Sequence, residues 1–177
     1  HGNRFYPDFS GVANSHNYYP TGPMKPADGI ASVALGLGHT VMEGGRSLKF
    51  SPKYPLHPVQ FSIVEDVLGN SQKTFYALGL TDAGAASDHR RLIKLLTLDI
   101  AEAETDGTLA ALASTYSPEN HQVYDGMGRE GLRLVSFAPV LKHGLFPLAE
   151  ILRLMLGIVA RGMSSSVEIE FAVNLSV

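Results

Sequence analysis

The segment that most restricts the fold lies near the C-terminal end, where a helical pattern passes directly into a strand pattern. In "FPLAEILRLMLGIVARG", apolar residues fall at helical spacing along one side: Leu148, Ile151, Leu152, Met155 and Val159. Pro147 suits the first turn of this helix, because a missing N–H costs little there, and Gly162 is expected to end it. The next segment, "VEIEFAV", alternates as a half-buried strand. A helix packed on a mixed sheet is therefore expected, in an α/β or α+β fold.

Two acidic residues interrupt the apolar pattern of this strand. Glu168 and Glu170 alternate with its apolar residues, so both point to the same face, about 7 Å apart. Two carboxylates at that distance repel by roughly 2 kcal/mol at an effective dielectric near 20. Either they are ordinary charges on a solvated strand face, or a divalent cation between them relieves the repulsion.

Composition excludes several classes of protein. The 177 residues are 45% hydrophobic and 18% charged, which fits one folded domain rather than a disordered chain. A net charge of −3, with no basic cluster beyond Arg90-Arg91, argues against a nucleic-acid surface. Glu150 and Arg153 interrupt the longest apolar stretch, so a membrane span is not expected. With no cysteine and no visible signal peptide, a cytoplasmic location is expected.

The ends of the chain suggest a piece of a longer polypeptide. It opens "HGNRFYPDF" without a methionine and stops in or just after a strand pattern. Residues 1–177 are therefore interpreted as a single-domain fragment, and whether it forms homo-oligomers stays open.

The rest of the chain mixes strand and helix patterns. Strands are expected in "DFSGVANS", "SLKFSPKYP", "VQFSIVEDV", "KTFYALGL" and "LRLVSFAPVL". "GIASVALGLGHTVMEGG" fits a buried helix or strand that leads into a turn. A helix is expected from Asp88, as N-cap, to about Ala101, with Leu92, Leu95, Leu96 and Leu98 toward the core. "DGTLAALASTY" fits a short helix, and "SPENHQVYDGMGREG" a long polar loop.

A glycine-rich stretch is the second candidate for chemistry. Gly36, Gly38, Gly44 and Gly45 lie close together, with Glu43 beside them. Such glycines serve turns that need positive φ, and a tight turn also brings backbone N–H groups near phosphate. The histidines lack metal-ligand spacing, so a zinc site is not expected. Ser164 to Ser166 have no base nearby in sequence, so a serine nucleophile is not supported.

Three motifs in order resemble the nucleotide-binding domain of the phosphoenolpyruvate synthase and pyruvate phosphate dikinase family. "VEIEFAV" resembles its Asp-Ile-Glu-(Phe/Trp) strand, "ALGLGHTVMEGG" its Gly-Leu-Gly-Glu-x-Val-Val-x-Gly segment, and "SGVANSHNYYP" a strand leading to a nucleotide-facing turn. The match is weak between about Leu56 and Gly131. The resemblance implies an ATP-grasp fold in which Mg-ATP transfers its β-phosphoryl group to a histidine on another domain. Pyruvate would be met only through other domains of the parent protein.

Carried over by position, the resemblance assigns two sets of residues. Glu168 and Glu170 would hold Mg²⁺ against the ATP phosphates, whereas ATP itself would contact Gly36, Gly38, Glu43 and Gly44. No catalytic residue is assigned. His39 stands where the family has Glu, and Glu168 where it has Asp, so a degenerate nucleotide-binding or regulatory domain is the alternative. A metal-dependent hydrolase is a third hypothesis. The fragment alone is expected to be inactive, because the family's amino-terminal lobe, Leu-Gln-x-Arg strand and phosphohistidine domain are not in it.

Overall fold

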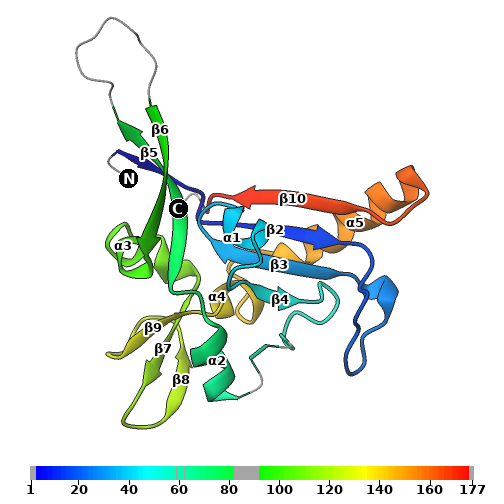
Figure 1. Ribbon diagram of the computed structural model, residues 1–177. Helices are drawn as coiled ribbons and strands as arrows, with labels where there is room; N and C mark the ends of the chain where they lie inside the picture. The colour runs from blue at the N-terminus through cyan, green and yellow to red at the C-terminus, as the bar shows by residue number, and fades with distance from the viewer. Residues whose placement is uncertain (1–2, 59, 62, 82–91, 176–177) are drawn as a thin grey trace, which may run out of the picture.

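The computed structural model describes residues 3–58, 60–61, 63–81 and 92–175 and contains three antiparallel sheets (Figure 1). The largest joins β10 (Glu168–Val173), β2 (Phe9–Asn14), β3 (Ile30–Leu35) and β4 (Leu48–Phe50), in that order. The second joins β1 (Arg4–Phe5), β5 (Thr74–Thr81) and β6 (Leu92–Asp99), and the third joins β8 (Gln122–Asp125), β7 (Ala113–Ser117) and β9 (Leu132–Val135). The α/β prediction is confirmed in this coarse form, but every described strand pair is antiparallel, so the expected mixed sheet is wrong.

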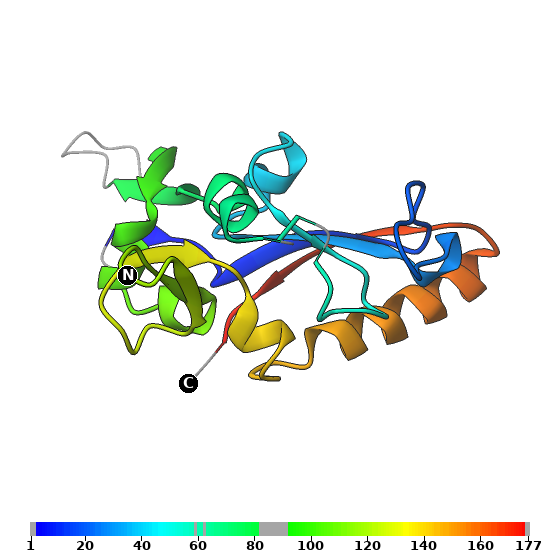
Figure 2. The same cartoon turned by 90° about the horizontal axis from the view of Figure 1, so that it is seen from below.

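The helices are short except for α5. They are α1 (His39–Met42), α2 (Val64–Asn70), α3 (Ile100–Thr105), α4 (Ala138–Leu141) and α5 (Leu148–Met163), with 3-10 turns at Pro26–Asp28 and Leu109–Ala111. In Figure 2, α5 lies on one side of the four-stranded sheet and α1 on the other. Within the described residues, no helix is long and apolar enough to cross a bilayer.

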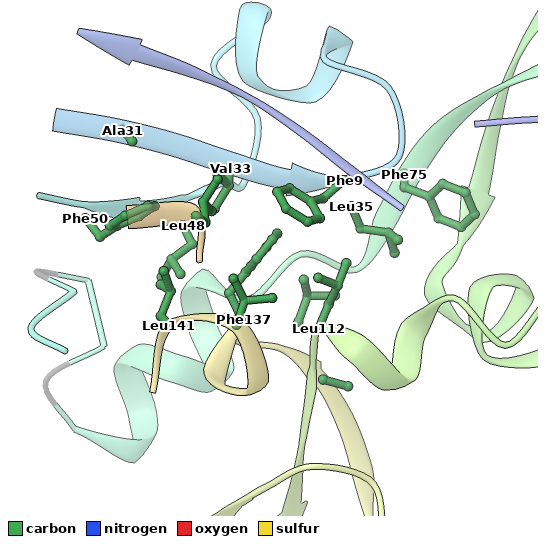
Figure 3. Close-up of a cluster of buried hydrophobic side chains, with 14 of the residues drawn as sticks. Phe9, Ala31, Val33, Leu35, Leu48, Phe50, Phe75, Leu112, Phe137 and Leu141 are labelled. Atoms are coloured by element: carbon green, nitrogen blue, oxygen red, sulfur yellow. The ribbon is translucent and has the colours of Figure 1, made fainter. Parts of the chain in front are cut away.

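The four-stranded sheet has one apolar face and one mixed face. Its register pairs Phe171 with Gly11 and Gly11 with Val33, so the odd-numbered residues of β10, β2 and β3 share the face that meets α4 and α5. Figure 3 shows this core between the sheet, α4 and the start of β7, with Phe9, Val33, Leu35, Phe50, Leu112 and Phe137 among its side chains. The ring of Phe9 meets that of Phe137 edge to face, with 5.5 Å between ring centres.

The expected C-terminal helix is confirmed, with small differences. Leu148, Leu152 and Leu156 form its buried stripe, whereas Met155 and Val159 are 38% and 37% exposed. The buried stripe differs from the predicted one because only the residues at i, i+4 and i+8 lie directly against the sheet. Gly162 lies within the helix, and Ser164 ends it in the left-handed conformation that glycine more often supplies.

The helix expected from Asp88 to Ala101 is wrong between Leu92 and Asp99, and of its described residues only Ile100 and Ala101 are helical, at the start of α3. Leu92–Asp99 is strand β6, which pairs along its whole length with β5, as Phe75 opposite Leu98 illustrates. Residues 88–91 lie outside the described range. The leucines have a spacing that also fits a helix. In the structure, pairing with β5 provides the backbone hydrogen bonds of this segment, and this tertiary context overrides the helix propensity of leucine. The helix that follows, α3, is capped by Asp99, whose side chain accepts from the Ala101 N–H at 2.9 Å.

Other expected elements are partly confirmed. "DFSGVANS" and "KTFYALGL" contain β2 and β5, and "SLKFSPKYP" contains β4. "GIASVALGLGHTVMEGG" holds β3, a turn and α1. "VQFSIVEDV" is not a strand where described, because α2 begins at Val64. "DGTLAALASTY" contains a 3-10 turn and the start of β7 rather than a helix. The long polar loop expected in "SPENHQVYDGMGREG" contains strand β8. "LRLVSFAPVL" is not one strand but divides into β9 and α4 at Phe137, whose φ is 56°.

Gln72 joins the three sheets. Its side-chain oxygen accepts from the Leu35 N–H at 2.9 Å, and its amide nitrogen donates to the carbonyls of Leu35 at 3.0 Å and Thr74 at 2.9 Å. The Gln72 backbone forms a bridge with Val135 at the end of β9. One buried amide therefore links the end of β3 to the start of β5, beside the third sheet.

Candidate functional site

The two glutamates of β10 lie on one face, as the sequence predicts. Glu168 is opposite Asn14 and Glu170 opposite Val12, on the face of the sheet away from α5. Both glutamates are exposed, which lowers their mutual repulsion relative to a buried pair. The confirmed part of the prediction is therefore the geometry, namely two parallel carboxylates on an open sheet face.

The two carboxylates have different partners. Glu168 Oε2 accepts a hydrogen bond from the Asn14 side-chain amide at 2.6 Å, whereas Glu170 has no ion-pair partner among the described residues. In the part of the chain that the structure describes, no group of three or more His, Cys, Asp or Glu side chains could hold a metal ion. The protein thus offers two carboxylates here, which suits Mg²⁺ shared with phosphate oxygens better than a complete protein cage.

The turn from β3 to α1 is built on Gly36. Its φ is 80°, and an added Cβ would lie 2.7 Å from the Tyr76 carbonyl oxygen, so any other residue is strained there. The Ser10 hydroxyl donates to the Gly36 carbonyl at 2.6 Å, and the Leu37 N–H donates to the Tyr76 carbonyl at 3.0 Å. These bonds fix where α1 begins, beside β2. At Gly36 the glycine is explained by backbone geometry.

Gly38 is not required by the backbone. Its φ of −59° and ψ of −12° are open to any residue, and a Cβ would meet only the Ser10 side chain, at 3.7 Å. Gly44 has a φ of 71° in open space, which is ordinary turn geometry. Of the predicted glycines, Gly38 is therefore the one whose small size the fold itself leaves unexplained.

Gly38 and Glu170 line the same pocket, although they are far apart in the sequence. The pocket has a volume of about 300 Å³. Its other walls come from β2, β10 and the start of α1, and include Ser10, Val12, Met42 and Ala172. The pairing of β10 with β2 brings Glu170 toward Ser10, and the Ser10 bond to Gly36 brings the turn to the same place. The pocket combines one free carboxylate with a backbone that a ligand can approach closely.

Glu43 and Gly44 are not part of this pocket. Glu43 Oε1 lies 3.1 Å from His39 Nε2, and its other oxygen accepts from the Tyr76 hydroxyl at 3.5 Å. Glu43 instead lines a second pocket of about 310 Å³, with Thr40, Arg46 and Lys73 and with Thr74 and Tyr76 of β5. Of the predicted nucleotide set, Gly38 lines the pocket with Glu170 and Glu43 lines the second pocket, whereas Gly36 and Gly44 line neither. Residues of α1 contribute to both pockets. Sequence reasoning missed Arg46 and Lys73, for which no motif gave a signal.

A larger pocket lies elsewhere and contains none of the predicted residues. It has a volume of about 550 Å³ between α5 and the 3-10 turn at Pro26–Asp28, and Arg153, Lys53 and His16 contribute to it. Lys53 Nζ is 2.7 Å from Asp28 Oδ1, and this contact lowers the pKa of Asp28 and raises the pKa of Lys53. These two charges compensate each other, and the described residues that line this pocket include no other carboxylate to hold a cation. Size alone does not make this pocket the better candidate.

Thr40 carries the one buried side-chain polar atom without a hydrogen-bond partner among the described residues. Replacing Thr40 with Val keeps the shape and removes the unpaired hydroxyl, so the free energy of unfolding is expected to rise by about 1 kcal/mol. Urea unfolding measures this. Thr115→Val is the matched control, because the Thr115 hydroxyl donates to the Gly126 carbonyl at 2.9 Å and accepts from Arg133. That variant should be destabilised, and equal losses in both variants would contradict the expectation.

Comparisons of the chain with protein-family models, with curated proteins and with solved structures gave no significant match. The function of the chain is therefore inferred from its sequence motifs and from the geometry of the pocket.

Proposed function

We propose that the pocket formed by Gly38 and Glu170 receives the phosphates of Mg-ATP, and that this chain is the nucleotide-binding part of a phosphoenolpyruvate synthase-like phosphotransferase. In this proposal the fold is part of an ATP-grasp domain. The phosphoryl acceptor is a histidine on another domain of the parent protein, and pyruvate is handled outside these residues.

The observation that carries the proposal is that Gly38 and Glu170 line the same pocket. Three motifs suggested two separate candidate groups, and one member of each lines the same 300 Å³ space. Gly38 is not needed for backbone reasons, but a glycine lets phosphate approach the main chain closely. A free carboxylate across the same pocket is the hard oxygen ligand that Mg²⁺ prefers.

The chemistry would depend on charge neutralisation and positioning. Mg²⁺ held with ATP would supply positive charge to offset the negative charge that develops during phosphoryl transfer. Glu170 would bind the ion directly, and Glu168 would hold it from the adjacent position on the same face. The Asn14 amide fixes the Glu168 carboxylate through their 2.6 Å hydrogen bond. Ser10 would position the glycine turn through its bond to Gly36.

A second candidate is nucleotide binding without catalysis. His39 occupies the family's glutamate position, and its ring is held by Glu43 at 3.1 Å and by edge-to-face contact with Tyr76 at 4.5 Å between ring centres. A histidine held in this way does not supply the anionic ligand that glutamate would. This observation favours a regulatory domain that retains the site but does not transfer phosphate.

Binding can be located on the chain itself, even if it is weak, by replacing Mg²⁺ with paramagnetic Mn²⁺. Adding Mn-ATP is expected to broaden amide resonances of residues 36–42 and 168–172 in NMR spectra, more strongly than Mn²⁺ alone. Gly38→Ala should retain the fold but reduce the broadening, because the methyl group intrudes on the phosphate position. Glu170→Gln should reduce it by removing a ligand.

Glu43→Gln is the matched control, since Glu43 lies outside this pocket. Its broadening should equal that of the wild type. Broadening centred elsewhere, or unchanged in Glu170→Gln and Gly38→Ala, would refute the proposed site.

A further inference from the structure

The outward side of α5 carries an apolar stripe that the sheet does not use. The stripe consists of Ile151, Leu154 and Ile158, spaced at intervals of three and then four residues, like the seam of a coiled coil. Leu154 is 63% exposed and Ile158 53% exposed. In Figure 2, α5 forms the outer layer on its side of the sheet. A rotation of 100° per residue places the stripe away from the buried Leu148–Leu152–Leu156 row.

Opposite charges lie at the two ends of this stripe. Glu150 is in the first turn of α5 and Arg161 in the last. A rotation of 100° per residue places both on the outward side, next to Leu154. The Arg161 side chain folds back over Gly157, 3.6 Å from where a Cβ would be. Neither Glu150 nor Arg161 forms an ion pair with a described residue, and Glu150 and Arg161 are both exposed.

We infer that the outward side of α5 binds a second copy of this chain, with the two helices antiparallel. A two-fold axis between Leu154 and Ile158 places Leu154 of one copy against Ile158 of the other. The same axis brings Glu150 of each copy beside Arg161 of its partner, because both residues lie at almost equal distances from the axis. A parallel pair would instead place Glu150 against Glu150 and Arg161 against Arg161. The charges thus fit one orientation of one occupant, the chain itself.

The size of the stripe sets the strength of this dimer. A 16-residue helix is about 24 Å long, and one pair of such helices buries less than the roughly 1,200 Å² of a stable standard interface. The dimer is therefore expected to dissociate on dilution into the low micromolar range. In Figure 2, α5 lies on the opposite side of the sheet from α1, which borders the pocket lined by Glu170, so the interface does not depend on the proposed nucleotide site.

Light scattering after size exclusion, over a concentration series of the 177-residue chain, tests the inference. The wild type should approach twice its 19.0 kDa mass at high concentration, whereas Leu154→Glu should stay monomeric with an unchanged circular dichroism spectrum. Leu132→Glu is the matched control, because Leu132 is 50% exposed on β9, away from α5. It should dimerise like the wild type. A wild type that is monomeric at every concentration, or dimers of Leu154→Glu, would overturn the inference.

Charge reversal tests the orientation. Glu150→Arg and Arg161→Glu should each weaken the dimer about tenfold or more, since each places like charges together in both symmetric contacts. The double variant Glu150→Arg/Arg161→Glu should restore it. Glu150 near the N-terminus of α5 and Arg161 near its C-terminus also interact favourably with the helix dipole. If this were their only role, the double variant would have the least stable helix, and its measured mass would not return to that of the dimer. Failure of the double variant to dimerise while its fold is intact would refute the antiparallel pairing.

Discussion

Replacing Gln72 with Leu is expected to lower the free energy of unfolding by roughly 3 to 5 kcal/mol. Gln72 is 4% exposed, and its amide satisfies the N–H and C=O of Leu35 and the C=O of Thr74. Leucine fills the space but leaves the two buried backbone groups of Leu35 and the partly buried carbonyl of Thr74 without this partner. Each buried group left unpaired costs about 1 to 3 kcal/mol. Domains of this size have only about 5 to 15 kcal/mol of stability, so the variant should be close to unfolding at 37 °C.

Urea unfolding measures the loss, and Gln60→Leu is the matched control. Gln60 also accepts from a backbone N–H, that of Lys49 at 3.0 Å, but it is partly exposed and water can replace it. That variant should stay within about 1 kcal/mol of the wild type. If Gln72→Leu is as stable as Gln60→Leu, the amide does not hold the sheets together as we describe.

In the phosphotransferase that we propose as the parent of this chain, Glu170→Gln is expected to lower ATP turnover by roughly 10²-fold or more. This expectation follows from the proposed function. The substitution keeps the shape of the side chain and removes the carboxylate that we propose binds Mg²⁺, so charge developing on the transferred phosphoryl group would be less well compensated. Folding should not suffer, because a repulsion between two exposed carboxylates is also removed.

ATP consumption and melting temperature, measured together, separate the possible roles of Glu170. An ordinary surface charge gives the same melting temperature and unaltered turnover. In the wild type, His39 and Tyr76 hold the Glu43 carboxylate outside the pocket. Turnover by the Glu43→Gln variant should therefore remain close to that of the wild type. Near-normal turnover of Glu170→Gln at saturating Mg²⁺ would reject Glu170 as a metal ligand.

Strongly periodic segments could be predicted from the sequence, since their patterns reflect burial directly. The alternation in "VEIEFAV" predicts that Glu168 and Glu170 share a face, and the structure confirms it. The segment from Leu92 to Asp99 was wrongly predicted as a helix, because the spacing of its leucines fits both the helical period and the strand period. Only its pairing with β5, which depends on the neighbouring chain, decides between them.

The pocket could not be predicted, because it arises from register rather than pattern. Glu170 lies near Gly38 only because β10 pairs antiparallel with β2, with Ala172 opposite Ser10. A shift of one residue would turn both glutamates to the other face. The position of Glu43 was equally hidden, since α1 rotates it toward Tyr76 rather than toward Glu170. Gln72 gave no signal, because a single glutamine before a strand has no distinctive spacing.

The pairing of β10 with β2 also bears on how the chain acquires its structure during synthesis. Asn14 and Glu168, which are hydrogen-bonded across this strand pair, are 154 residues apart. Contacts of such long range form slowly, and a chain emerging from the ribosome with its N-terminal end first cannot make them until translation has passed β10. Until then, the edge of β2 and the core face beneath Phe171 stay uncovered. Nascent chains should therefore bind chaperones until β10 emerges, and loss of β10 should cause aggregation rather than a smaller stable domain.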